Sequence, residues 1–552
     1  MKFMLTGRIL GRPSLVTVSA LGLAAFLMNA CSTTETLDAD SGGGGQSPAG
    51  GSATGDGGTG GSPVSGPGGQ GGEGGVAAPE VEVAELAELA VKSADSYDDN
   101  AYGIISGTTL AGYHKDWEAN RPAGVTGKLV ILQVLASGQA AQVIVSNEKD
   151  GVYSYVLPTA KVAQARSNGL SNFETDIPDG PTADALLKLY GIDPTKDFVV
   201  LTFEAPPGTA SSVVQSVGRA WVFFNYWGWP KERLAILNGS INVNGTLGSN
   251  DPQKVQIAAT AQQKFSLPKD NGTKSFKDLY RDQTVVSVSA EEIIAVLEEP
   301  ENGALRSKVR IVDARGGAEA LGLKKATNTG RTTCASYDST TPGNPLNKKC
   351  STPFEGRIRG ANSVPWTGFL QDLTNGYRFL SPADAKALFD AQSGWVDGTH
   401  EFTIQYCRTN QRSTVTGMVA NLILGYPTRL YETSFIEWGH LSAGPADVVA
   451  GDVTETFPNK SLLPEASPFR TDLAAYTEHA VLNAADSAAY VPGGTLGVLT
   501  QPVTWVAGPN YNDEADVNPP STAVGDLWPK LNAAGTTTRA SIEADRAYLR
   551  AE

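Results

Sequence analysis

The residues best suited to chemistry in this 552-residue chain lie in a six-residue turn that begins with Cys407. Arg408 follows the cysteine directly and Arg412 closes the turn. Residues 402–406, before the turn, carry β-branched and aromatic side chains and predict a buried strand. Residues 413–424, after it, carry apolar side chains at helical spacing and predict a helix. A cysteine at a strand end, facing a helix start and flanked by two arginines, is well placed to be a thiolate.

A thiolate forms at neutral pH only if its charge is stabilised, because a free cysteine titrates near about 8.5. Backbone N–H groups at the start of the helix, with Ser413 or Thr414 as its expected N-cap, would point toward the sulfur. The N–H groups of a tight turn can add an anion nest, and the arginines add fixed positive charge. We therefore expect Cys407 to be the catalytic nucleophile. The expected anion-binding residues are Arg408, Thr409, Asn410, Gln411, Arg412 and Ser413.

The amino-terminal residues have the parts of an export signal. A basic start precedes an apolar run over 14–28, which is followed by Asn29-Ala30-Cys31. The run is shorter than the roughly twenty residues that a spanning helix needs. Ala30 before Cys31 resembles the lipobox of bacterial lipoproteins, which implies lipidation of Cys31. We expect a periplasmic or outer-surface protein that contacts the membrane only through this anchor, with simple secretion after cleavage nearby as the alternative.

The chain has four cysteines, and their positions suggest different fates. Cys334 and Cys350 bracket a Gly/Pro/Thr-rich loop and could form a disulfide outside the cytosol. With Cys31 lipidated, Cys407 is left as the one odd thiol, which in an exported protein favours reactivity. The alternative for Cys407, a buried inert cysteine, fits poorly with its two arginine neighbours.

The charge of the chain limits the classes of partner. The formal charge is −15, and removal of residues 1–30 would take it to about −18. Such an acidic protein is a poor partner for nucleic acid or for an anionic membrane surface. The four histidines show no metal-ligand spacing, so we expect no metal and no cofactor.

Strands that alternate with helices predict an α/β fold with parallel sheets after a flexible Gly/Ser/Pro-rich linker over 32–79. The same order of elements occurs twice, which indicates an internal duplication. In the first repeat we expect strands over 128–134, 197–203 and 233–237 and helices over 82–93, 182–190 and 211–227. In the second we expect strands over 309–313, 402–406 and 429–431 and helices over 291–297, 383–392 and 413–424.

The duplication assigns different tasks to its halves. When strand 197–203 is aligned with strand 402–406, Glu204 stands opposite Cys407, and no arginine closes the turn after it. We therefore expect residues 80–275 to be a catalytically silent domain and 276–445 to be the catalytic one. Residues 446–552 form an extension of unknown role, with one helix over 539–551, which we expect to pack on the second repeat.

Four motifs together make the chain resemble the tandem form of the rhodanese family of sulfurtransferases, over roughly residues 85–445. They are IVDAR (311–315), GRIRGANSVPW (356–366), CRTNQRS (407–413) and SFIEWGHL (434–441). The resemblance implies two tandem rhodanese-like domains, each a mainly parallel sheet flanked by helices. It implies that Arg315 either contacts the substrate or holds the fold through a salt bridge. Glu319 stands near a position where thiosulfate-type members often carry a second arginine.

The resemblance also implies a reaction. Related phosphatases place five residues between cysteine and arginine, whereas here Arg412 is the fifth residue after Cys407, and the tighter ring suits a sulfur atom. Cys407 would take the outer sulfur of thiosulfate as a persulfide and pass it to cyanide or a thiol by ping-pong catalysis. The acceptor could also be a protein. Two arginines in the turn favour thiosulfate over mercaptopyruvate.

Two other functions stay open at this point. One is a persulfide or chalcogen-oxyanion carrier, acting as a redox partner in a cell-surface assembly without turnover of its own. The other, which the length of the turn disfavours, is a phosphatase-like enzyme or an arsenate reductase.

Overall fold

The computed structural model describes most of the chain between residues 80 and 441, together with residues 538–551. The described ranges are 80–135, 142–167, 172–205, 212–243, 274–298, 308–320, 356–358, 360–371, 376–441 and 538–551, with short pieces at 246–247, 255, 257–259, 479–481 and 504–506. The expected lipidation site Cys31, the linker over 32–79 and the Cys334–Cys350 pair lie outside these residues. No helix within the described ranges is long and apolar enough to cross a membrane.

The first repeat is built on a five-stranded, fully parallel sheet. Its order is β2 (Gly103–Ile105), β9 (Leu234–Leu237), β8 (Phe198–Phe203), β3 (Leu129–Leu135) and β5 (Val152–Pro158). Strands β3 and β8 are buried along their whole length, which explains their nearly continuous apolar sequences. The helices are α1 (Gly107–Lys115), α2 (Trp117–Asn120), α3 (Gly180–Tyr190) and α4 (Ser212–Tyr226). Four short pairs lie outside the two larger sheets of the described residues. They are β1 (Glu82–Val83) with β11 (Arg281–Asp282), β4 (Gln142–Ile144) with β10 (Ile257–Ala259), β6 (Gln164–Ser167) with β7 (Asn172–Asp176), and β16 (His479–Val481) with β17 (Thr504–Val506).

The second repeat repeats this plan with four parallel strands. Their order is β13 (Asn362–Ser363), β12 (Val309–Asp313), β14 (Phe402–Tyr406) and β15 (Thr428–Leu430). Its helices are α5 (Ala290–Glu298), α7 (Gly317–Ala320), α10 (Pro382–Ser393), α11 (Arg412–Met418) and α12 (Ser434–Leu441). The expected α/β class with mainly parallel sheets flanked by helices is thus confirmed.

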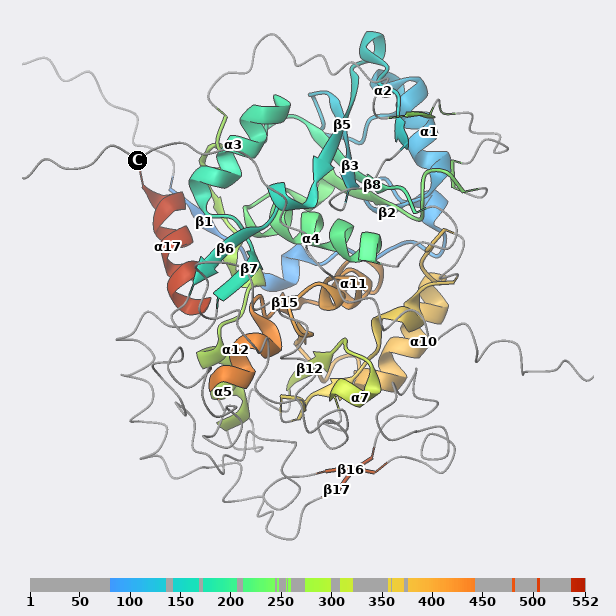
Figure 1. Ribbon diagram of the computed structural model, residues 1–552. Coiled ribbons are helices and arrows are strands. Elements are labelled where there is room, and N and C mark those ends of the chain that lie inside the picture. The colour runs from blue at the N-terminus through green and yellow to red at the C-terminus, as the bar shows by residue number, and fades with distance from the viewer. Residues whose placement is uncertain are drawn as a thin grey trace, which may run out of the picture.

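Helices α4 and α11 meet between the two sheets, where Figure 1 shows the first repeat above the second. Almost every described side chain on both helices is buried, including the hydroxyl side chains of Ser413, Thr414 and Thr416 on α11. The helices approach closely at Gly218, because a Cβ there would collide with the side chain of Thr414. The two repeats therefore share one core.

The expected helix over 82–93 is wrong. Strand β1 (Glu82–Val83) pairs in parallel with β11 (Arg281–Asp282), and only a short 3-10 helix, Leu86–Leu89, follows it. The chain then runs extended along a π-helical turn, Val419–Ile423, that continues α11. There the N–H groups of Val91 and Ser93 donate to the carbonyls of Asn421 and Ile423 at 2.8 and 3.1 Å. These bonds to a remote part of the chain outweigh local helical preference.

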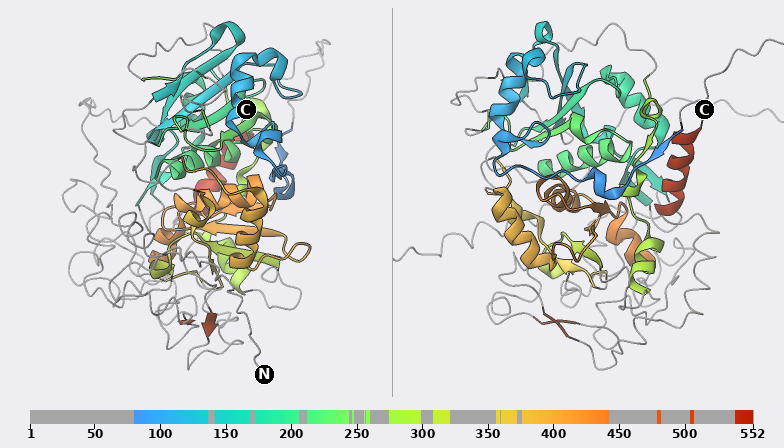
Figure 2. Two further views of the ribbon diagram at one scale, coloured as in Figure 1. Left: turned by 90° about the vertical axis from the view of Figure 1, so that its right-hand side faces the viewer. Right: turned by 180° about the vertical axis from the view of Figure 1, so that it is seen from behind.

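The helix predicted near the carboxyl end is present as α17 (Thr538–Arg550), shown in red beside α3 in Figure 1 and at the side of both repeats in Figure 2. It packs on α5 and the preceding segments of the second repeat and on α3 of the first, and its polar contacts reach both repeats. Asp545 Oδ2 accepts hydrogen bonds from Arg166 at 2.9 Å and from Tyr226 at 2.8 Å. The expectation that this segment packs on the second repeat is therefore incomplete.

Candidate active site

Cys407 lies directly after β14 and is fully buried between the sheet edge and the start of α11. The helix begins at Arg412, and Gln411 occupies the N-cap position without a side-chain hydrogen bond. Ser413 and Thr414 lie inside the helix, so the expectation that one of them is the N-cap is wrong. Their hydroxyls serve the turn in other ways, which are described below.

The backbone of the turn is held from one side by the start of α12. Ser434 Oγ accepts hydrogen bonds from the N–H of Asn410 at 3.0 Å and from the N–H of Cys407 at 3.4 Å. The N–H groups of Phe435 and Ile436 donate to the carbonyls of Cys407 and Arg408, both at 3.2 Å. Because the first N–H groups of a helix have no partner within it, α12 uses them to fix the turn. Its sequence motif at 434–441 is thereby explained.

The surroundings of Cys407 favour the thiolate. Burial alone would raise the pKa of the thiol, since an apolar environment disfavours charge. The positive charge of Arg412, the hydroxyl of Ser413 and the N–H groups of Ser413 and Thr409 outweigh burial and lower the pKa below its ordinary value. The stabilising groups expected from the sequence at Cys407 are therefore largely present in the structure.

Glu319, on α7, pairs with both arginines of the turn. Its carboxylate accepts from Arg412 Nη1 at 2.5 Å and from Arg408 Nη2. Burial alone would lower the pKa of Arg412, but Glu319 and the Cys407 thiolate raise it above its ordinary value. The turn is therefore less positive than its own sequence suggests, because one carboxylate is shared between two guanidinium groups.

Arg315 is fully buried and is held by groups of the fold. Its guanidinium forms two-pronged bonds to Asp313, at 2.9 Å from Nε and 2.6 Å from Nη2, and also donates to the Gly356 carbonyl. It lies over the ring of Phe435 at 4.1 Å. Tyr406 donates to the same carboxylate at 2.8 Å. Of the two roles left open by the sequence, these contacts favour the structural one.

Glu204 directly follows β8, at the place in the first repeat that matches Cys407. Its carboxylate accepts from the N–H of Gln142 at 2.6 Å and from Asn242 Nδ2 at 3.2 Å. Burial raises its pKa, and the Gln142 hydrogen bond opposes the rise. An acceptor-only carboxylate held this way has no means of carrying a transferable sulfur, in keeping with the expectation that this repeat is silent.

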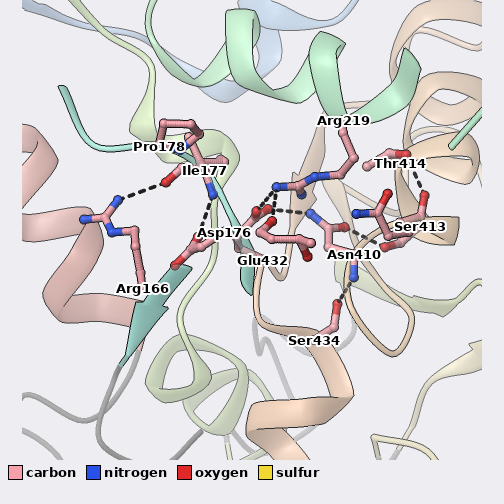
Figure 3. A network of polar contacts seen from close by, with 12 residues as sticks. Arg166, Asp176, Ile177, Pro178, Arg219, Asn410, Ser413, Thr414, Glu432 and Ser434 are labelled. Atoms are coloured by element: carbon pink, nitrogen blue, oxygen red, sulfur yellow. Dashed lines mark hydrogen bonds and ion pairs between the residues drawn. The ribbon is translucent and has the colours of Figure 1, made fainter. Parts of the chain in front are cut away.

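A buried polar network joins the turn to the first repeat, and the sequence interpretation missed it (Figure 3). Arg219 on α4 donates to Glu432 and, at 2.6 Å, to the Thr175 carbonyl. Glu432 accepts from Asn410 Nδ2 at 2.6 Å, and Asn410 Oδ1 accepts from Ser413 Oγ at 2.5 Å. Arg219 is the one charged residue in the sequence of α4, which is a signal that could have drawn attention to it.

Asp176 lies at the edge of this network, at the end of β7. Burial raises its pKa to about 8, with a further contribution from the charge of Glu432, while Arg166 and Arg219 oppose the rise. Burial and the Glu432 charge outweigh the two guanidinium groups, so Asp176 takes up a proton far more readily than an exposed aspartate.

Comparison with known proteins gives one sequence match of note. No family model matches the chain. It is 32% identical over 93 residues to a Haloferax volcanii protein described as "Putative thiosulfate sulfurtransferase". The match covers 17% of this chain and 30% of that protein. The chain thus spans under a third of the length of this curated relative.

Three solved structures are similar in fold. The Tum1 protein of Saccharomyces cerevisiae has a TM-score of 0.41 at 15% identity, covering 63% of this chain and 97% of that one. YnjE has a TM-score of 0.40 at 16% identity, covering 61% and 66% of the two chains. The 3-mercaptopyruvate sulfurtransferase of Leishmania major has a TM-score of 0.35 at 11% identity, covering 61% and 74%.

The described residues themselves form a mixed α/β protein with mainly parallel sheets flanked by helices. The sequence likeness of the chain is to the sulfurtransferases, over a limited segment.

Proposed function

We propose that the protein transfers sulfane sulfur through a persulfide on Cys407. The observation that carries the proposal is a buried thiol with a lowered pKa, held in a turn whose arginine is the fifth residue after it. In the first half-reaction the thiolate attacks the outer sulfur of thiosulfate. The S–S bond of the donor breaks, and sulfite leaves with its electron pair. Cyanide or a thiolate then takes the outer sulfur and returns Cys407 as a thiolate.

Thiosulfate remains the proposed donor, for reasons of charge and size. Its negative end suits the guanidinium groups of Arg408 and Arg412, although Glu319 offsets part of their charge. A fully buried sulfur at the end of a strand also favours a donor that presents a terminal sulfur atom. A bulkier donor such as mercaptopyruvate is the less favoured candidate.

The test is a single-turnover reaction with stoichiometric products. Reduced protein mixed with excess thiosulfate should release one sulfite and gain the mass of one sulfur, and cyanide should then remove that sulfur as thiocyanate. Cys407→Ser should give neither product while keeping the thermal transition of the native protein. An unmodified, reduced Cys407 after this treatment would refute the proposal.

The close pairing of Glu319 with both arginines supports a second candidate, a sulfur carrier without free turnover. A turn whose cations are already partnered could hold a persulfide without admitting donor and acceptor in quick succession. A stable one-sulfur adduct on Cys407, combined with turnover no faster than the uncatalysed reaction, would favour the carrier over the enzyme.

We also propose, on the sequence pattern around Cys31, that the protein is exported and lipid-anchored. The turn at Cys407 would then act outside the cytosol, on small sulfur compounds or on the thiol of a partner protein.

A further inference from the structure

We propose that Arg219, contributed by the silent repeat, is a positioning residue for the Cys407 turn and acts through Glu432 and Asn410. The inference rests on the proposed use of Cys407 as the nucleophile. It gives the first repeat a task in the reaction even though Glu204 stands in place of its own cysteine.

Burying Arg219 at this position is costly. Its side chain is 1% exposed, and it is the one charged residue of a helix whose described side chains are buried and mainly apolar. Glu432, 2% exposed, is its ion-pair partner. Among the described residues, Arg219 Nε and Nη1 have no hydrogen-bond partner. A buried ion pair with incomplete hydrogen bonding stabilises a fold poorly, so fold stability alone is a weak reason for it.

Glu432 connects Arg219 to the turn. One carboxylate oxygen accepts from Arg219 and the other accepts from Asn410 Nδ2 at 2.6 Å (Figure 3). Asn410 has a φ of +53°, in the left-handed region that few residues other than glycine adopt. The bond to Glu432 and the bond from its N–H to Ser434 hold Asn410 in this conformation. The turn closes around Cys407 only while it does so.

The contacts of the Asn410 amide fix the direction in which it points. Both oxygens of the Glu432 carboxylate accept, one from Arg219 and the other from Asn410, so Nδ2 faces Glu432 and Oδ1 is turned to Ser413. The Ser413 hydroxyl has one proton and two acceptors, Asn410 Oδ1 at 2.5 Å and the Cys407 sulfur, whose charge it stabilises. Arg219 occupies one oxygen of the Glu432 carboxylate and leaves the other to Asn410, and this arrangement sets which acceptors the hydroxyl can serve.

Charged groups from every side face this network. Arg219 and Glu432 lie within it, Arg412 faces the sulfur from α11, and Asp176 and Arg166 approach from the β6–β7 hairpin. A change in charge at one of them shifts the thiol pKa whether or not the turn moves. The test must therefore separate a shift in pKa from a loss of geometry.

The experiment measures the single-turnover rate of persulfide formation with thiosulfate across pH, in Arg219→Met, Glu432→Gln and Asn410→Gly. Glycine tolerates the left-handed φ and removes only the amide. At high pH the rate of persulfide formation should reach a plateau. We expect each variant to lower this plateau rate by about 10- to 100-fold, the size of effect that a small misplacement of a reacting group causes. Pairs of these substitutions should lower it no further than the singles, because they interrupt one chain of contacts. Arg219→Lys should recover part of the loss.

The matched control is Lys128→Met. It breaks another poorly exposed ion pair of the first repeat, which Lys128 forms with Asp197 just before the start of strand β3. Its plateau should stay within about twofold of the native rate. A shift of the thiol pKa in Arg219→Met with an unchanged plateau would overturn the proposal, since charge alone would then explain Arg219. A fall in all variants, control included, in proportion to lost thermal stability would overturn it too.

Alkylation of Cys407 by iodoacetamide across pH needs no sulfur donor, and so separates this inference from the proposed function. If the native protein forms no persulfide, the proposed function fails, and alkylation still decides on Arg219. A loosened turn in Arg219→Met and Asn410→Gly should expose the buried sulfur. The plateau rate of alkylation at high pH should then rise at least severalfold above the native value. Unchanged plateaus would overturn the inference.

Discussion

Replacing Glu319 by glutamine should improve the reaction with thiosulfate. The carboxylate contacts both Arg408 and Arg412, so a donor anion bound to the same guanidinium groups would lie about 5 Å from it. At an effective dielectric constant of about 20, two unit charges at that distance repel by about 3 kcal/mol. The side chains involved are 13 to 22% exposed, and solvent screening reduces this to about 1–2 kcal/mol. We therefore expect kcat/KM for thiosulfate to rise about 5- to 30-fold in Glu319→Gln.

The assay is thiocyanate production at several thiosulfate concentrations and at low and high salt. The gain should appear mainly in KM and should shrink as salt is added, because the repulsion is electrostatic. Glu401→Gln removes a more exposed carboxylate, the partner of Lys308, from the same repeat and should change kcat/KM by less than about twofold. An unchanged or lower kcat/KM in Glu319→Gln, with the protein folded, would show that Glu319 does not compete with the donor.

Three further predictions concern the turn, the interface between repeats and the amino terminus. Ser413→Ala removes a hydroxyl that lowers the pKa of Cys407, so the pH at which persulfide formation begins should move upward. The reaction at pH 6 should then fall severalfold, and a profile that coincides with the native one would contradict the role of the hydroxyl. Gly218→Ala places a methyl group against Thr414 and should cost about 1–3 kcal/mol in the free energy of unfolding, measured by urea titration; a cost near zero would mean that α4 and α11 move apart freely. Cys31→Ala, expressed in a bacterium with two membranes, should shift the protein from the membrane fraction to the soluble fraction, and equal membrane retention would rule out lipidation at this residue.

Much of the fold could be predicted because its strands are short apolar runs. The bounds of β12 and β14 match the residues expected, 309–313 and 402–406, and the turn between β14 and α11 follows from them. The segment 82–93 could not be predicted in the same way. Its preference for helix is local, whereas its hydrogen-bond partners lie more than 300 residues further along the chain.

The candidate site also has a part that could be predicted from the sequence and a part that could not. The residues of the turn itself, Cys407 to Ser413, could be picked out because they are adjacent in the sequence. Glu319 lies on α7, Glu432 follows β15, and Arg219 lies on α4 of the first repeat, so only the tertiary fold brings them together around the turn. A lone arginine in an apolar helix and a glutamate near a familiar motif are weak signals in a sequence. Their charges become informative only once burial and pairing are known.

Hydrogen bonds join the beginning of the described chain to the π-helical turn after α11. They limit how far the two halves of the chain can be separated. The π-helical turn offers carbonyls that the extended segment around Val91 and Ser93 occupies, and α4 covers the other side of the same helix. A fragment holding only residues 276–445 would keep its whole sheet and its cysteine. It would nevertheless expose the apolar face of α11 and leave Glu432 without its cation. Each half thus depends on the other for its buried contacts, and an engineer who wishes to graft the Cys407 turn elsewhere must take both halves with it.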